Sequence, residues 1–229
     1  MKTSFLLCLL SLALCQWVSA AVVVEYPFPV NVSSGAPVVY DARLSASNPS
    51  WVGVAPTYGF GGSAGNAYVG STNKIAAFDS GKYLTFTVEA EDGFTLRLDA
   101  FHFDLGGSAR DADLSVHVEI RTSVDGFAAS LPLAGGGTVA SRLIEEGNST
   151  PVYSAFAVPL GDQFDNLTSI TFRLHIYLET IPTSGWLRMD NFVLEGVTQA
   201  IPEPSAGWLL MVAAGGTFLI TRRRFRNAL

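Results

Sequence analysis

Cysteine is almost absent from this 229-residue chain. Its two cysteines, Cys8 and Cys15, both lie within the first twenty residues, so a chain cut after Ala20 contains none. The remainder has no disulfide to hold it, and a domain of about 180 residues must be stabilised by its own hydrophobic core. Metal sites built from cysteine are excluded by the same absence.

Histidine and basic residues are also scarce. His102, His117 and His175 are the only histidines, and none has a second ligand at the spacing of a zinc site. His117 and His175 fall on the polar faces of predicted strands, where we expect them to have cross-strand surface partners. Residues 21–200 carry 9 basic and 19 acidic side chains, a formal net charge of −10. Such a surface excludes nucleic acid as a partner and suits an extracellular protein.

Helical periodicity is missing between Ala21 and Ala200, and alternation of apolar with polar residues takes its place. Three long stretches alternate, and four shorter ones read as further strands: 83–89, 114–121, 170–179, 38–43, 138–144, 152–158 and 187–194. In residues 94–105 the apolar positions change parity, which a β-bulge near Ala100 would reconcile. Turns rich in glycine and aspartate separate the runs, and the pattern predicts an all-β fold, an antiparallel β-sandwich.

The first twenty residues have the three parts of a secretory signal peptide. Lys2 supplies the positive charge, residues 5–14 the apolar region, and Val18-Ser19-Ala20 a small-residue cleavage site. Signal peptidase would cut between Ala20 and Ala21. We therefore expect residues 21–200 to form one exported domain.

The C-terminal segment has three consecutive parts. Pro202-Glu203-Pro204 precedes 15 uncharged residues, 207–221, which would span about 22 Å as a helix. Including Ser205 and Ala206, residues 205–221 are a candidate transmembrane helix, short for a bilayer core of about 30 Å. The helix is followed by a cluster of basic residues: Arg222, Arg223, Arg224 and Arg226. Because positive charge stays on the cytoplasmic side, we expect the C-terminus inside and the domain outside the membrane.

A Pro-Glu-Pro motif, a hydrophobic segment and an arginine cluster in this order resemble the PEP-CTERM sorting signal of bacterial envelope proteins. The resemblance covers residues 201–229 and implies processing near the motif by a membrane-embedded peptidase, the exosortase. It also implies a place in the cell envelope or the exopolysaccharide matrix.

The middle of the chain is similar to the jelly-roll domains common in PEP-CTERM proteins. The similar stretches are 83–90, 123–127, 171–174 and 188–196. The last of them, with Asp190-Asn191, is similar to the closing strand of carbohydrate-binding jelly rolls. That resemblance implies a structural Ca²⁺ with Glu25 and Asp190 as ligands; a bulge or turn that satisfies Asp190 locally is the alternative.

Aromatic residues in a glycine-rich stretch are the best candidates for binding a ligand. Trp51, Tyr58 and Tyr68 could stack on sugar rings, and packing in the core is the alternative for them. Gly61 to Gly65 matches G-x-S-x-G, but its flanks lack the helix that a nucleophile elbow requires.

We therefore expect a protein that is not an enzyme, with a structural or adhesive role at the cell surface. A carbohydrate-binding module is the first alternative. A polysaccharide hydrolase is the second, since abundant carboxylates offer pairs but no motif selects one.

Overall fold

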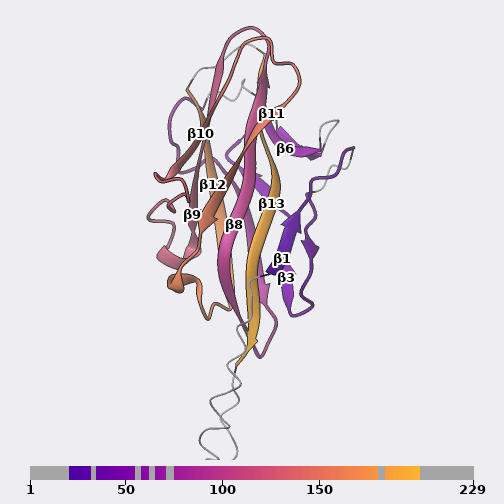
Figure 1. Cartoon of the computed structure of the whole chain (residues 1–229), viewed down its shortest axis with the longest axis vertical. Helices are drawn as coiled ribbons and strands as arrows, with labels where there is room; N and C mark the ends of the chain where they lie inside the picture. The colour runs from indigo at the N-terminus through magenta and orange to yellow at the C-terminus, as the bar shows by residue number, and fades with distance from the viewer. Residues whose placement is uncertain are drawn as a thin grey trace, which may run out of the picture. The chain divides into compact units, whose positions relative to one another are not determined.

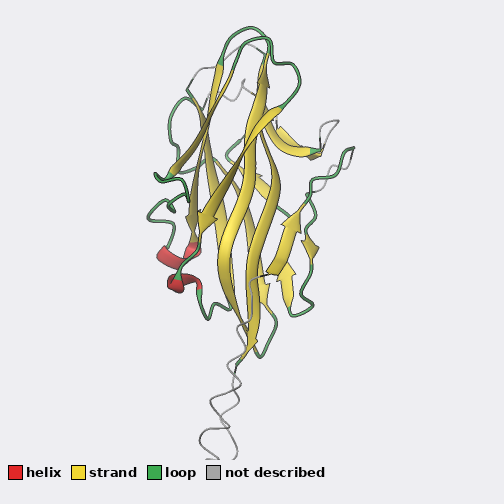
Figure 2. Cartoon of the chain, viewed as in Figure 1, coloured by secondary structure: helices red, strands yellow, loops and turns green. Residues whose placement is uncertain are grey.

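The computed structural model describes six stretches of the chain: residues 21–31, 35–54, 58–61, 65–70, 75–179 and 184–201. They contain β-strands and short 3₁₀ turns at Ser123–Asp125 (η2) and Asp162–Phe164 (η3), and no α-helix (Figure 2). Within these residues no helix has the length and apolarity that crossing a bilayer demands. Contacts divide the chain into residues 1–199 and 200–229. The predicted signal peptide, sorting motif and arginine cluster lie outside the described residues.

One antiparallel sheet, sheet A, is built around two 16-residue strands that run through the domain (Figure 1). These are β8 (Phe94–Ala109) and β13 (Gly185–Ala200). One edge of β13 is next to β8. The other edge pairs with β6 near the start of β13 and with β1 nearer its end. The other described strands of the sheet are β1 (Ala21–Tyr26), β2 (Val38–Val39), β5 (Tyr58–Gly61), β6 (Asn66–Gly70) and β11 (Val152–Pro159).

The second antiparallel sheet, sheet B, contains the strands whose alternation was clearest in the sequence. Its order is β10-β9-β12-β7-β3, with β4 also paired to β7. Buried and half-exposed residues alternate along β7, β9 and most of β12, which confirms the predicted periodicity. The strand bounds are β3 (Leu44–Ala46), β4 (Ser50–Val52), β7 (Tyr83–Ala90), β9 (Leu114–Thr122), β10 (Val139–Ile144) and β12 (Ser169–Leu178).

Eight of these strands follow the order of a jelly roll. Sheet A contains β1-β13-β8-β11 and sheet B contains β7-β12-β9-β10. Numbered one to eight along the chain, they read 1-8-3-6 and 2-7-4-5, which is two interlocked Greek keys. The described domain is therefore all-β with antiparallel sheets, in the jelly-roll-like arrangement that the sequence predicted.

Aromatic rings from both sheets meet in the core. Phe86 and Phe172 of sheet B stack at 5.1 Å, and Phe101 and Phe192 of sheet A meet edge to face at 5.6 Å. The two pairs touch each other, since Phe101 and Phe172 are 5.5 Å apart. All four side chains are at most 1% exposed. A core of this kind holds the sheets together without any disulfide, as the absence of cysteine required.

Two predictions about individual strands have outcomes in the structure. In β8, Leu98 and Phe101 are buried while Asp99 and Ala100 between them are half exposed, so the predicted change of parity is observed. The predicted strand at Val38–Arg43 is shorter than expected, because the ladder with β1 covers Val38 and Val39 alone. Beyond it, Asp41 accepts hydrogen bonds from Arg43, and this local contact forms a turn.

The segment Ile75–Lys82 covers part of sheet B, and His175 lies beneath it. His175 is 2% exposed, between the rings of Phe78 and Tyr83 at 5.1 Å each. Its Nδ1 lies 3.3 Å from the carbonyl oxygen of Asp79. The predicted surface position of His175 is wrong: it has a cross-strand partner, Tyr83, but it is buried because this segment folds over it.

Candidate functional site

The outer face of sheet A gathers polar and aromatic side chains from four neighbouring strands. Along β13, Trp186, Arg188 and Asp190 point outward while Leu187 and Met189 are buried in the core. We call this surface the sheet A patch and define it by eight residues: Asn66, Tyr68, Asp104, Tyr153, Trp186, Arg188, Asp190 and Asn191. They come from β6, β8, β11 and β13, which lie side by side in the order β11-β8-β13-β6.

Tyr68 and Trp186 form an aromatic corner at one end of the patch. Their rings are 5.5 Å apart at 78°, and both side chains are partly exposed. The guanidinium of Arg188 lies 6.0 Å from the Tyr68 ring and 5.8 Å from that of Trp186. Tyr68 lies over Gly59 on the next strand, where any larger residue would collide with its hydroxyl. The corner is therefore held in place by the backbone and by a cation–π contact.

A buried amide connects the aromatic corner to the next tyrosine. Asn66 is fully buried; its Nδ2 donates to the Tyr153 hydroxyl at 2.8 Å, and its Oδ1 accepts from Arg188 at 3.0 Å. Burial raises the pKa of Tyr153 and lowers the pKa of Arg188. Asn66 therefore holds both groups from below, the Tyr153 hydroxyl through its Nδ2 and the Arg188 guanidinium through its Oδ1.

A bulge places two carboxyl groups at the other end of the patch. Asn191 has φ +51°, so Asp190 and Asn191 both face outward although they are adjacent. Asp190 Oδ1 accepts from the Asn191 backbone at 2.8 Å, and Asp104 Oδ2 accepts from the Asn191 amide at 2.7 Å. Burial, with the charge of Asp104 nearby, raises the pKa of Asp190 to about 6.

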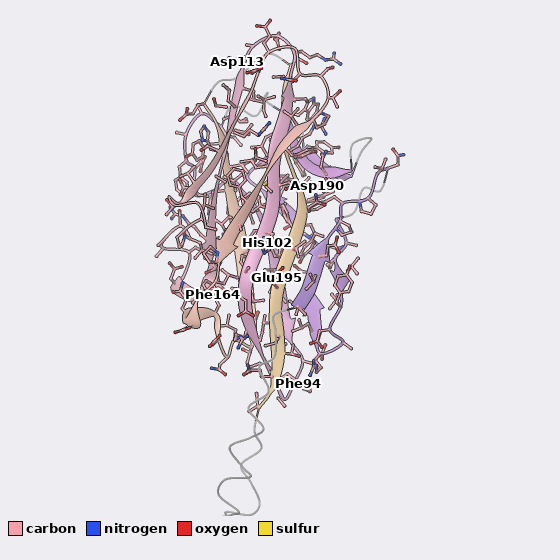
Figure 3. All side chains as sticks on the ribbon, viewed as in Figure 1. Phe94, His102, Asp113, Phe164, Asp190 and Glu195 are labelled. Carbon is pink, nitrogen blue, oxygen red and sulfur yellow. The ribbon has the colours of Figure 1, made fainter. Side chains whose placement is uncertain are left out.

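Figure 3 shows where this end of the patch lies on β13. Asp190 is on the half of the sheet nearer Asp113, whereas Glu195 and His102 lie farther toward Phe94. The chain leaves β13 at Ala200, beside the start of β8, where Thr95 bonds to the carbonyl of Gln199 at 3.5 Å. The patch is thus at the opposite end of β13 from the point where the C-terminal segment begins.

The structure divides the three predicted glycan-binding aromatics. Trp51 lies on β4, packs on Phe60 at 6.1 Å, and is 6.5 Å from Tyr58. Its indole nitrogen donates to Gly59 at 3.3 Å, so Trp51 is partly incorporated into the core. Tyr58 is 44% exposed beside it. Tyr68 points to the opposite face of the β5–β6 hairpin, because successive residues of a strand alternate.

The predicted calcium ligands are not brought together. Glu25 pairs with Val193 across the sheet, three residues from Asp190, or roughly 10 Å along the strand. The Glu25 carboxylate accepts from the Tyr40 hydroxyl at 2.6 Å, whereas Asp190 is engaged by Asn191. Across the described residues no cluster of three or more acidic, histidine or cysteine side chains could hold a metal. The contacts fit the alternative, a bulge that satisfies Asp190 locally, and they do not fit one ion shared with Glu25.

Two further sequence expectations have structural outcomes. His117 lies opposite Ser141 and Tyr177 on the neighbouring strands, bonds to Ser141 at 2.8 Å and stacks on Tyr177 at 4.7 Å, as a cross-strand partner should. The flanks of Gly61–Gly65 are strands β5 and β6 of a hairpin, so the helix of a nucleophile elbow does not follow.

Most of the patch could not be found from the sequence. Tyr68 was predicted in one role, Asp190 with Asn191 beside it in another, and the other five residues were missed. Asn66 and Tyr153, for example, are 87 positions apart and touch through strand pairing. One signal was available, since Trp186, Arg188 and Asp190 share a face of a predicted strand.

Comparisons with known proteins identify no family. No protein-family model matches the chain, and no curated protein does either. Among solved structures, the K3 cleaved adhesin domain of Lys-gingipain from Porphyromonas gingivalis is 15% identical, with a TM-score of 0.33, over 77% of this chain and 99% of that one. A carbohydrate-binding module specific for non-crystalline cellulose, CBM28, is 13% identical, with a TM-score of 0.35, over 65% and 87%.

A cyclase from Fischerella is 11% identical, with a TM-score of 0.31, over 80% of this chain and 90% of that one. At such identities and TM-scores these likenesses carry no argument about function. The fold description rests on the strand order, and the site on its own contacts.

Proposed function

We propose that this protein is an exported adhesive protein that binds carbohydrate through the sheet A patch. The observation that carries the proposal is the arrangement of Tyr68, Trp186 and Arg188 around the buried amide of Asn66. Sugar-binding surfaces combine aromatic rings, which stack on the apolar face of a sugar, with fixed polar groups that bond to its hydroxyls. The patch supplies both kinds of group on neighbouring strands of one rigid sheet.

The polar groups of the patch match a polyhydroxylated ligand. The Tyr153 hydroxyl accepts from Asn66 and keeps its own proton for a ligand oxygen. Asp190 and Asp104 each use one carboxylate oxygen on Asn191 and keep the other as an acceptor. Donors near the aromatic corner and acceptors near the bulge together suit a chain of sugar rings lying across the strands.

The sequence supports the delivery of this domain to the cell surface. We propose cleavage by signal peptidase after Ala20, membrane insertion of residues 205–221 with the C-terminus in the cytoplasm, and processing by an exosortase at Pro202-Glu203-Pro204. The support is the order of motif, apolar run and arginine cluster described above. In the cell envelope the domain would then bind exopolysaccharide as an adhesin or matrix component, without catalysing a reaction.

The binding proposal is tested on the full chain, purified in detergent, by affinity electrophoresis through gels containing a panel of polysaccharides. Trp186→Ala and Tyr68→Ala should each remove the retardation produced by any polysaccharide that binds, because each removes one wall of the aromatic corner. Tyr58→Ala is the matched control: it removes a more exposed tyrosine from the same hairpin but from the other face, and we expect unchanged retardation.

Three results would contradict the proposal. No retardation by any polysaccharide would remove carbohydrate binding altogether. Retardation that is lost in Tyr58→Ala and kept in Trp186→Ala would move the site to the Trp51–Tyr58 face. Release of reducing ends, lost in Asp190→Asn or Asp104→Asn, would instead indicate a hydrolase, since a carboxyl with a raised pKa beside a second carboxylate is the pair that such enzymes use.

A further inference from the structure

We infer that the sheet A patch takes polysaccharides whose rings carry no anionic group, and that it rejects uronate-bearing and sulfated chains. The inference rests on the proposed function, because it concerns the ligand class of the same surface. It follows from where the charges of the patch are directed.

The guanidinium of Arg188 is the one cation among the eight patch residues, and the buried amide of Asn66 holds it against the sheet. Arg188 donates through Nη1 to the buried Asn66 and is flanked by the rings of Tyr68 and Trp186. Its Nε is buried and has no hydrogen-bond partner in the described part of the chain. An anion on a sugar ring would have to approach this guanidinium between the two rings that flank it. Arg188 therefore stiffens the aromatic corner and is poorly placed to meet a ligand carboxylate.

The two anions of the patch face outward and are not neutralised. Asp104 and Asp190 flank Asn191 from β8 and β13, and Asn191 bonds to both. Within the described residues neither carboxylate has a basic side chain within 4.0 Å, although six other acidic side chains do. A ligand hydroxyl can donate to the oxygens that Asn191 leaves unused. A ligand carboxylate or sulfate at the same place meets two like charges.

The groups that face the Asp190 carboxylate determine when it carries a charge. Asp104 faces it from β8, Tyr153 from β11, and Asn191 and Arg188 from its own strand. Burial and the neighbouring Asp104 hold its pKa near 6. Above that pH the patch carries both charges and should discriminate most strongly. Below it Asp190 is neutral, and the rejection of anionic chains should weaken.

Matched polymer pairs test the inference on the full chain. Hydroxyethylcellulose with carboxymethylcellulose, and dextran with dextran sulfate, each share a backbone and differ in charge. Dissociation constants from isothermal titration calorimetry at pH 7.5 should be at least about tenfold lower for the neutral member of any pair that binds. At pH 5 the difference should shrink. In Asp104→Asn with Asp190→Asn the ratio of the two constants should shrink at pH 7.5 as well, because both like charges are removed.

The outcomes separate this inference from the proposed function. An anionic polymer that binds as tightly as its neutral partner at pH 7.5, or more tightly, overturns the inference and leaves carbohydrate binding in place. If Arg188→Gln then removed that binding, the guanidinium would be an anion site after all. Failure of both members of both pairs, with retardation by other polysaccharides also absent, refutes the proposed function and the inference with it. Asp92→Asn, in an exposed turn outside the patch, is the matched control and should leave every constant unchanged.

Discussion

At the scale of single residues, the left-handed backbone of Asn191 decides what the patch contains. A strand with regular alternation would turn Asn191 inward after Asp190, and the core would then have to accept an amide. The bulge lets both residues face outward, and it returns Phe192 to the core at 1% exposure. Asparagine tolerates this conformation better than most residues. One backbone angle therefore preserves the aromatic core and creates the acidic end of the patch.

Asp190→Asn should stabilise the domain above pH 6. The unfolded aspartate loses its proton near its ordinary value of 3.8, whereas the folded one holds it until about pH 6. Between these values the folded state loses stability as pH rises, and above pH 6 the loss is complete. The amide keeps the bond to Asn191 without the charge. We expect a gain of about 1 kcal/mol at pH 7.5 after solvent screening, falling toward zero below pH 4.

Urea unfolding of Asp190→Asn and of the parent at pH 7.5 and pH 3.5 measures this effect. Asp92→Asn, in an exposed turn, provides the baseline for loss of a surface charge. An equal gain from both substitutions at pH 7.5 would show that net charge, and not the surroundings of Asp190, is responsible.

At the scale of elements, the segment Ile75–Lys82 and sheet B are joined by a stack of rings and cations. Phe127, Arg173 and Tyr83 lie in succession at 3.7 and 4.6 Å, and His175 continues the stack to Phe78. Arg121 closes it 4.4 Å from Phe78. Burial, with Arg121 and Arg173 on either side, lowers the pKa of His175. The stack therefore favours the neutral imidazole.

Acidification should loosen this segment through His175. As pH falls below the ordinary histidine value, the unfolded chain takes up a proton before the buried imidazole does, so stability decreases down to the lowered pKa. His175→Phe keeps an aromatic ring in the stack and cannot be protonated. We expect its free energy of unfolding to fall less than that of the parent between pH 7.5 and pH 5, because one of the histidines with a lowered pKa has been removed. Part of the decrease should remain, since the pKa of His117 is also lowered.

Amide hydrogen exchange of residues 75–82 at the two pH values locates the change. In the parent, exchange corrected for its intrinsic pH dependence should be faster at pH 5, and in His175→Phe it should not. His102→Gln alters a histidine whose side chain is 41% exposed and serves as the control. Equal acceleration in His175→Phe and the parent would contradict a role for the imidazole.

At the scale of the whole molecule, strand pairing fixes where the two ends of the domain emerge. Ala21 pairs with Gly196, so the first residue after the predicted cleavage site lies beside the last residues of β13. The patch begins at the other end of that strand, since Trp186 is about 46 Å from Ala200 at 3.3 Å per residue. The patch and the last residues of the domain therefore lie toward opposite ends of β13.

Sorting is tested by changing the motif and not the domain. Pro202→Ala combined with Pro204→Ala should leave the protein in the membrane fraction with Leu229 still present, because the proposed processing site is lost. Ser205→Ala, beside the motif, should be processed as the parent is. Intact mass of protein recovered from cells reports both termini at once. Release of the doubly substituted chain from the membrane, with the same C-terminal residue as the processed parent, would refute the exosortase proposal.

Much of the fold could be predicted because strands are local patterns. The alternation in β7, β9 and β12 depends on neighbouring residues alone, and so does the change of parity in β8, where Leu98 and Phe101 are both buried. The absence of cysteine likewise required a packed core, and Phe86 and Phe172 provide it. The surface position predicted for His175 was wrong because it depends on a non-local contact. Nothing near His175 in the sequence indicated that Phe78 would cover it.

The sequence by itself determined the class of fold, the positions of its main strands and the chemical character of its two ends. Only the tertiary structure decided that Tyr68 belongs with Trp186 and not with Tyr58, and that Tyr153 and Asp104 join them. The physical reason is that the register between strands is set by hydrogen bonds between distant segments and by packing in the core. A shift of one residue in the register of any of these strands would turn its side chains to the other face of the sheet.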